Sequence, residues 1–240
     1  WRNEQRTAQA ARLANEGIGH LELGRKEEAR SAFLSALEID PDNAGALGNL
    51  SIVEMQLGHD EAALVHAEAA AEAAPEEAVH QYNLGSLLAL KKRYEEALSR
   101  LQRAIEIDPG YVHAYNELGN VYLDLDRPAD ARKAFESGMK RDRTFAKLHK
   151  NLARTALAEG HPEEAIHHLE TALPLFPPAD PAGKAEASYW LAAARAEAGR
   201  ATEACAALNE FAVLDPQRLS PFATKAKLLA EEHRCTSSSS

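Results

Sequence analysis

The sequence predicts an all-α chain of six successive helix-turn-helix units and a terminal capping helix. Three observations predict this fold class. Four columns of residues recur with one period of 34 residues along the 240-residue chain,. Alanine fills 48 positions whereas aromatic residues reach only 6%, which favours close-packed helices over β-sandwiches,. Within each period, apolar residues fall at helical spacing.

The period is clearest in a column of alanines spaced 34 residues apart, with a final step of 39: Ala29, Ala63, Ala97, Ala131, Ala165 and Ala204. Twelve residues before each alanine stands a small residue: Gly17, Ser51, Gly85, Gly119, Ala153 and Ala192. Five residues before each alanine stand Gly24, Gly58, Lys92, Asp126, Gly160 and Gly199. Twelve residues after, five of six positions hold proline. Columns that share one period indicate a repeat protein.

The unit at residues 78–111 shows how each repeat folds. Apolar residues at helical spacing predict two helices, and Lys92-Arg93 between them predicts a tight turn,. Gly85 and Ala97 are small, so we expect them to let the two helices approach closely. Asp108-Pro109 ends the second helix, because the residue before a proline avoids the helical conformation. Each period is therefore one helix hairpin.

These columns resemble the tetratricopeptide repeat, in which position 8 is small, positions 20 and 27 are alanine, position 24 is large and apolar, and position 32 is proline. Position 24 here holds Phe33, Ala67, Leu101, Phe135, Leu169 and Leu208. The resemblance covers six units: 10–43, 44–77, 78–111, 112–145, 146–179 and 185–218. It implies a right-handed α-solenoid whose first helices line a concave face. Arg143 in place of proline and the bulky Phe211 at position 27 depart from the pattern.

The remaining residues are assigned around this array at 10–218. Residues 1–9 extend the first helix, and residues 180–184 form a loop insertion because residues 178–184 contain two prolines and a glycine,. Residues 219–234 read as an amphipathic capping helix, which a repeat array needs to cover its last apolar face. Residues 235–240 are of low complexity and are expected to be a disordered tail.

Composition excludes several function classes. The net charge of −10 argues against nucleic acid as a partner,, and no apolar run is long enough for a membrane span. Cys205 and Cys235 are too few for a disulfide framework, so we expect reduced thiols, with Cys205 buried and inert. The chain is expected to be soluble, with bacterial cytoplasm and periplasm both open.

No catalytic or cofactor motif is present, so we expect a protein that is not an enzyme and binds no cofactor. His161, Glu164 and His168 lie on one helical face at a spacing that could hold a metal,. A solvated helix face explains them better, and no metal site is predicted.

The functional signal lies on the first helices. Position 6 of the units reads Asn15, Asn49, Asn83, Glu117, Asn151 and Trp190. Asparagine is a mediocre helix former, and its amide can pair with both backbone groups of an extended peptide. The column resembles the asparagine ladder of the O-linked N-acetylglucosamine transferase superhelix. The alternative is that each asparagine bonds only within its own helix. The predicted peptide-binding residues are Asn49, Tyr82, Asn83, Asn116, Asn120, Lys147, Lys150, Asn151 and Arg154.

Lys147, Lys150 and Arg154 form one basic stripe within an acidic protein. We interpret it as an anion site for acidic side chains or a carboxylate of a protein or peptide ligand. The C-terminal carboxylate clamp of chaperone-binding members is matched at only two of five positions, which argues against that role.

The leading hypothesis is a non-catalytic protein-interaction scaffold that binds a partner segment in a concave groove. One alternative is the targeting or regulatory arm of a larger enzyme or of a membrane-anchored bacterial assembly factor. A second is a self-assembling scaffold, since homo-oligomers remain open.

Overall fold

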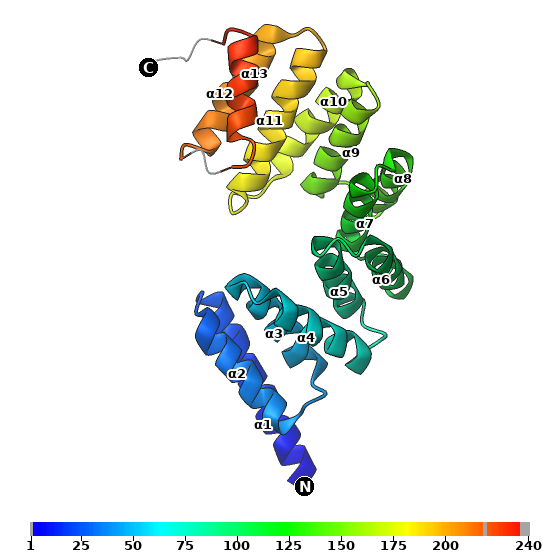
Figure 1. Ribbon diagram of the computed structural model, residues 1–240, viewed down its shortest axis with the longest axis vertical. Helices are drawn as coiled ribbons and strands as arrows, with labels where there is room; N and C mark the ends of the chain where they lie inside the picture. Colours follow the sequence, from blue (N-terminus) through cyan, green and yellow to red (C-terminus); the bar gives the residue numbers. More distant parts are fainter. Residues whose placement is uncertain (1, 218–219, 236–240) are drawn as a thin grey trace. The chain divides into compact units, whose positions relative to one another are not determined.

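The structure, a computed structural model, describes residues 2–217 and 220–235, and only the backbone of residues 2 and 3. The described residues form thirteen α-helices and one short 3-10 helix, without a strand (Figure 1). The prediction of an all-α fold is therefore confirmed. Six helix hairpins follow one another: α1 (Arg2–Glu22) and α2 (Lys26–Ile39), α3 (Ala44–Leu57) and α4 (Asp60–Ala73), α5 (Ala78–Leu90) and α6 (Tyr94–Ile107), α7 (Val112–Asp124) and α8 (Pro128–Met139), α9 (Ala146–Ala158) and α10 (Pro162–Ala172), α11 (Pro181–Glu197) and α12 (Ala201–Leu214). The 3-10 helix η1 (Leu173–Leu175) extends α10, and α13 (Ala223–Glu232) follows α12.

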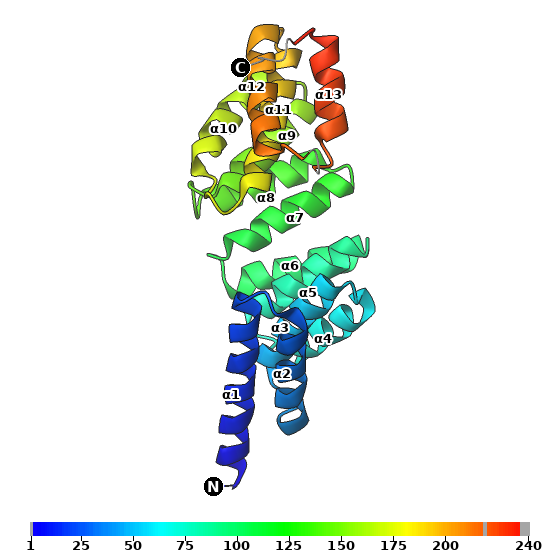
Figure 2. The ribbon, with the colours of Figure 1, turned by 90° about the vertical axis from the view of Figure 1, so that its left-hand side faces the viewer.

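The chain divides into two compact units, with the boundary between Glu117 and Leu118 inside α7. In the N-terminal unit, the first helices of neighbouring repeats contact each other, α1 with α3 and α3 with α5. In the C-terminal unit, α9 contacts α11 in the same way. Figure 2 shows the long helix α1 lying beside α2. Within each unit the first helices therefore form a continuous row.

Small residues set the distance between the two helices of a hairpin. A Cβ atom built on Gly119 would lie 2.2 Å from the ring of Phe135, and one on Gly85 would lie 2.8 Å from Leu101. Both partners are fully buried. The column of small residues predicted from the sequence thus leaves space on the first helix of each hairpin. A large residue of the second helix fills that space.

The turns between the paired helices share one backbone conformation. The turn column has a positive φ in every repeat, from 56° at Asp126 to 81° at Gly58. Glycine adopts this left-handed conformation without cost, whereas a side chain is penalised. Lys92 (φ 60°) and Asp126 are the non-glycine members. The column therefore marks a left-handed turn residue that all six hairpins share.

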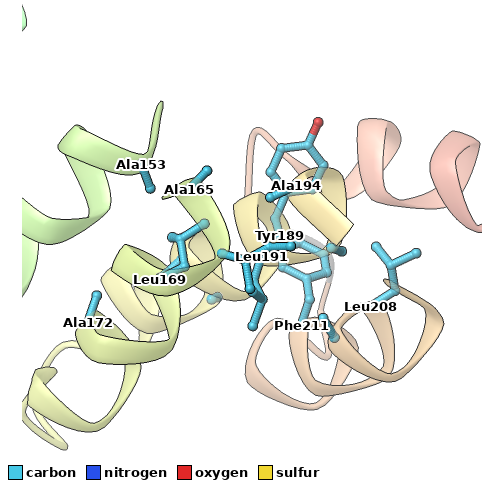
Figure 3. Close-up of a cluster of buried hydrophobic side chains, with 14 of the residues drawn as sticks. Ala153, Ala165, Leu169, Ala172, Tyr189, Leu191, Ala194, Leu208 and Phe211 are labelled. Atoms are coloured by element: carbon cyan, nitrogen blue, oxygen red, sulfur yellow. The ribbon is translucent and has the colours of Figure 1, made fainter. Parts of the chain in front are cut away.

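The core of the C-terminal unit is built from alanines and a few large side chains. Figure 3 shows Leu169 of α10 beside Ala153 and Ala165, and Leu208 and Phe211 of α12 facing Tyr189 and Leu191 of α11. Leu169 and the alanines of this group are fully buried. Alanine at the crossing points brings the helices close, which is why the chain needs so few aromatic residues.

The predicted loop at 180–184 is wrong. Residues 181–184 form the first turn of α11, and the side chain of Asp180 caps it by accepting a hydrogen bond from the Gly183 amide (2.8 Å). Pro181 occupies the first helical turn, where a missing N–H costs nothing. The same residues that mark a loop also start a helix, and the insertion lengthens α11 to 17 residues.

The prediction of reduced cysteines is also wrong, because Cys205 and Cys235 form a disulfide with their Cα atoms 5.3 Å apart. Cys205 is half-buried and Cys235, assigned to the tail, is bonded to α12. The rest of that predicted tail, residues 236–240, and the start of the predicted capping helix at residue 219 lie outside the described residues. Within the described part, the capping helix is the shorter α13.

Candidate functional site

In the N-terminal unit the predicted binding residues Asn49, Tyr82, Asn83 and Asn116 lie on the first helices. Tyr82 of α5 is half-buried, and its ring meets that of Tyr111 edge-on with centroids 5.2 Å apart. His113 lies beside both rings, at 6.2 Å from Tyr82. Burial raises the pKa of the Tyr82 hydroxyl. Tyr82 on α5, Tyr111 just before α7 and His113 on α7 thus form one aromatic group.

Asn49 of the N-terminal unit has a hydrogen-bond partner within its own helix. Asn49 donates from its amide nitrogen to the Gly45 carbonyl of its own helix (2.9 Å). The alternative interpretation of the column, a bond within the helix, therefore describes Asn49. Asn83 and Asn116 are half-buried on α5 and α7.

In the C-terminal unit, side chains from three first helices contact one another in succession. Asn151 of α9 donates to the side-chain oxygen of Asn120 on α7 (3.1 Å) and accepts from the Arg154 guanidinium (3.2 Å). The Arg154 guanidinium in turn lies over the ring of Trp190 on α11, 5.6 Å from its centroid. We call these four residues the Asn–Arg–Trp row. It joins the first helices of three consecutive repeats.

The basic stripe is paired within the chain. Lys150 is 8% exposed and forms an ion pair with Glu186 of the next first helix (2.5 Å). Burial lowers the pKa of the Lys150 ammonium, and the charge of Glu186 opposes that shift. Lys147 is exposed and lies 3.8 Å from Asp180. The stripe therefore serves the packing of α9 against α11 before any ligand is present.

Sequence reasoning missed the aromatic group at the end of this row. Phe222, which precedes α13, packs against Tyr189 (centroids 4.9 Å apart) and Trp190 (5.8 Å). Trp190 also donates from its indole nitrogen to Glu186 (3.4 Å). Tryptophan in place of the position-6 asparagine of the last repeat was the available signal, since a large aromatic there requires partners.

The histidines considered for a metal are held by other contacts. His161 lies 3.8 Å from Glu164, which also pairs with Arg132 (2.6 Å). His149 donates through Nε2 to the Arg143 carbonyl, and its Nδ1 lies 3.2 Å from Nδ1 of His168. Over residues 2–217 and 220–235, no group of three or more histidine, cysteine or acidic residues is placed to hold a metal ion.

The repeated hairpins, the small column and the left-handed turn define a helical-repeat protein of the kind that binds other proteins. Sequence profiles described as tetratricopeptide repeat match residues 49–112 and 150–218, residues 88–155, and residues 10–43. The chain belongs to the tetratricopeptide repeat family.

One curated relative is the type IV pilus assembly protein PilF of Pseudomonas aeruginosa, 33% identical over 129 residues, which are 53% of this chain and 51% of PilF. The chain thus matches about half the length of that relative. The solved structure of P. aeruginosa PilF has a TM-score of 0.77 at 22% identity and covers 93% of this chain and 99% of its own. The structure of PilW, a type IV pilus biogenesis factor, has a TM-score of 0.78 at 17% identity and covers 91% and 98%. These structures share the fold.

Membership of this family supports a role as a protein-interaction scaffold.

Among the residues that the structure describes, no helix combines the length and the apolar character needed to cross a bilayer.

Proposed function

We propose that the chain is a non-catalytic scaffold that binds a segment of a partner protein on the face formed by its first helices. The observation that carries the proposal is the Asn–Arg–Trp row. It places amide, guanidinium and indole groups of three repeats side by side on one face. Arg154 and Trp190 are half-buried, so part of each side chain faces solvent. Arginine and tryptophan are enriched among the residues that dominate binding energies at protein interfaces.

The internal pairing of the basic stripe changes the expected ligand. Lys150 is already neutralised by Glu186, so an acidic side chain of the partner would have to compete with a half-buried carboxylate that is already in place. Contacts with Arg154 and Trp190 favour instead a segment that presents backbone carbonyls and an apolar or aromatic side chain. The N-terminal unit offers Tyr82, Asn83 and Asn116 on its own first helices as further contacts.

The test is peptide-array binding with wild type and Arg154→Ala. Truncation of an interface arginine of this kind is expected to weaken capture by roughly tenfold or more. The control is Lys133→Ala on α8, whose side chain is 78% exposed on a second helix. If every captured peptide binds Arg154→Ala and wild type equally, the first-helix face of the C-terminal unit is not the binding surface.

A role in type IV pilus assembly is a second candidate, favoured by the match to PilF. The partner would then be a component of the pilus machinery, and a membrane anchor or further domains could be supplied by a longer protein. Deletion of the gene in its own host is expected to remove surface pili counted by electron microscopy, and the wild-type gene should restore them. Normal piliation of the deletion strain would exclude this role.

Self-assembly is the remaining alternative. Light scattering over a concentration series distinguishes it, because a scaffold that stacks through its ends grows in mass with concentration. A constant monomer mass would reject it.

A further inference from the structure

The last two helices form an antiparallel pair that is closed at both ends. Residues 215–222 connect the end of α12 to the start of α13. At the opposite end, Cys205 in the first half of α12 is bonded to Cys235 just beyond α13, across 30 positions of sequence. Figures 1 and 2 both show α13 beside α12. The pair is therefore a covalent ring.

The end of α13 is shaped to deliver Cys235 to α12. Arg234 adopts a left-handed conformation (φ 52°), and the Cys235 amide donates back to the Ala230 carbonyl (2.9 Å). This is the hydrogen-bonding pattern of a helix that ends in a tight reversal. The reversal directs the chain back toward α12 at the residue that carries the thiol.

The contact between the two helices is weak apart from this bond. A cavity of about 400 Å³ lies between them, lined mainly by apolar side chains that include Leu208, Phe211 and Ala226 and by Cys235 at one end. Ala226 is buried, and Leu229 and Ala230 of α13 are half-buried against the same core. A 10-residue helix is too short to be stable on its own,. One buried alanine, two half-buried apolar side chains and a cavity stabilise α13 less than a filled interface would.

The other end of α13 has its own anchor. Phe222 packs on Tyr189 and Trp190, and the Ser220 amide donates to the Asp215 carboxylate (3.1 Å). These contacts do not depend on the cysteines. Loss of the disulfide would therefore free the end of α13 near Cys235 first, while the end near Phe222 stays attached.

We propose that the Cys205–Cys235 disulfide is a redox latch that holds α13 over the apolar face of α12. A dithiol reductant opens the latch by thiol–disulfide exchange: the S–S bond breaks, both cysteines take up one hydrogen each, and the dithiol is oxidised to its own disulfide. In the reduced chain α13 opens from its Cys235 end and exposes Leu208 and Phe211 to solvent. The latched form belongs to oxidising surroundings.

The test is hydrogen exchange of the full chain, oxidised and after reduction with dithiothreitol, with the thiols counted by Ellman's reagent. Amides of residues 227–235 are expected to exchange at least about tenfold faster after reduction, because a cross-link over this length changes the opening equilibrium by on the order of 10²-fold. Amides of α9 and α10 serve as internal reference and should not change. Fluorescence of anilinonaphthalene sulfonate should rise as the apolar face opens.

The matched variant is Cys205→Ser with Cys235→Ser, which should exchange like the reduced wild type and ignore dithiothreitol. Equal exchange of residues 227–235 in oxidised and reduced protein would overturn the latch. Two free thiols in protein purified from an oxidising compartment would overturn it as well.

Discussion

Single residues on the first helices pack against neighbouring helices and also belong to the proposed binding face. Lys150 is the clearest case, because a residue predicted as a ligand contact is buried against Glu186. A charge in such a place is stable while its partner is present, and removing one partner leaves an uncompensated charge. The basic stripe therefore helps to fix how α9 is positioned against α11.

This pairing predicts an asymmetry between single and double substitutions. Glu186→Gln should lower the free energy of unfolding by about 1–3 kcal/mol, the cost of leaving a buried polar donor without its full partner, because the Lys150 ammonium loses its counter-charge. Lys150→Met combined with Glu186→Leu should be close to neutral. Urea denaturation measures both. Lys147→Met at the exposed pair with Asp180 should change stability by less than about 1 kcal/mol. Equal losses in all three variants would contradict a buried ion pair.

His168 makes stability depend on pH. Burial and the neighbouring His149 lower the pKa of His168 to about 4, whereas an unfolded histidine titrates near 6.5. The charges of His167 and Arg132 act in the same direction, and that of Glu164 opposes them. Above about pH 6.5 neither state binds the proton, so the stabilisation is complete. Between about pH 6.5 and 4 the unfolded chain binds it first, and stability falls by up to roughly 3 kcal/mol.

Urea midpoints across this pH range check the expectation, with His168→Gln as the variant. Its pH profile should be flatter than that of wild type. His167→Gln, which alters the exposed neighbour, should keep most of the slope. A wild-type profile that is flat from pH 6.5 to 4 would rule out a histidine held neutral in the folded chain.

Among the elements, the hairpin is the unit that the sequence specifies best. Its small column, its left-handed turn and its alanines are local or separated by fixed spacings, so periodicity reveals them. The error at 180–184 has a simple cause. Asp-Pro is a turn signal and also an N-cap with a first-turn proline, and the choice between them depends on whether the next residues continue as a helix.

The close approach within a hairpin gives a sharp test at Gly119. An added Cβ would lie 2.2 Å from the Phe135 ring, which is fully buried. Gly119→Ala should therefore destabilise the protein by about 1–3 kcal/mol through overpacking. Gly19→Ala in α1 is the matched control, because nothing lies within 4 Å of its added Cβ. The control should be neutral or stabilising by up to about 1 kcal/mol, since alanine is the better helix former. Thermal unfolding compares them, and equal behaviour would contradict the packing.

The pairings that the sequence did not reveal share a different origin. Glu186 lies 36 positions from Lys150, and Cys235 lies 30 positions from Cys205. Each pair joins two segments that are far apart in the sequence, and each pairing occurs once in the chain. Periodicity describes what all repeats share, so contacts that occur once in the chain stay hidden until the helices are placed.

At the scale of the whole molecule, each repeat contacts mainly its neighbours. A destabilising substitution should therefore affect its own repeat and the adjacent repeats, and not distant ones. Leu169 and Leu50 are fully buried in the C-terminal and N-terminal units, respectively. Leu169→Ala should cost about 2–5 kcal/mol and speed hydrogen exchange in α9 to α12. Exchange in α1 to α4 should stay near the wild-type rate. Leu50→Ala should give the reverse pattern, and a uniform acceleration along the chain would contradict nearest-neighbour coupling.

The ring formed by α12 and α13 also decides how the chain carries mechanical force. Tension applied to the polypeptide beyond Cys235 passes through the sulfur atoms directly to the first half of α12. The helix α13 lies outside that path and bears no load while the bond is intact. Pulling from this end would therefore meet the body of the last repeat first, and α13 would be protected from extension.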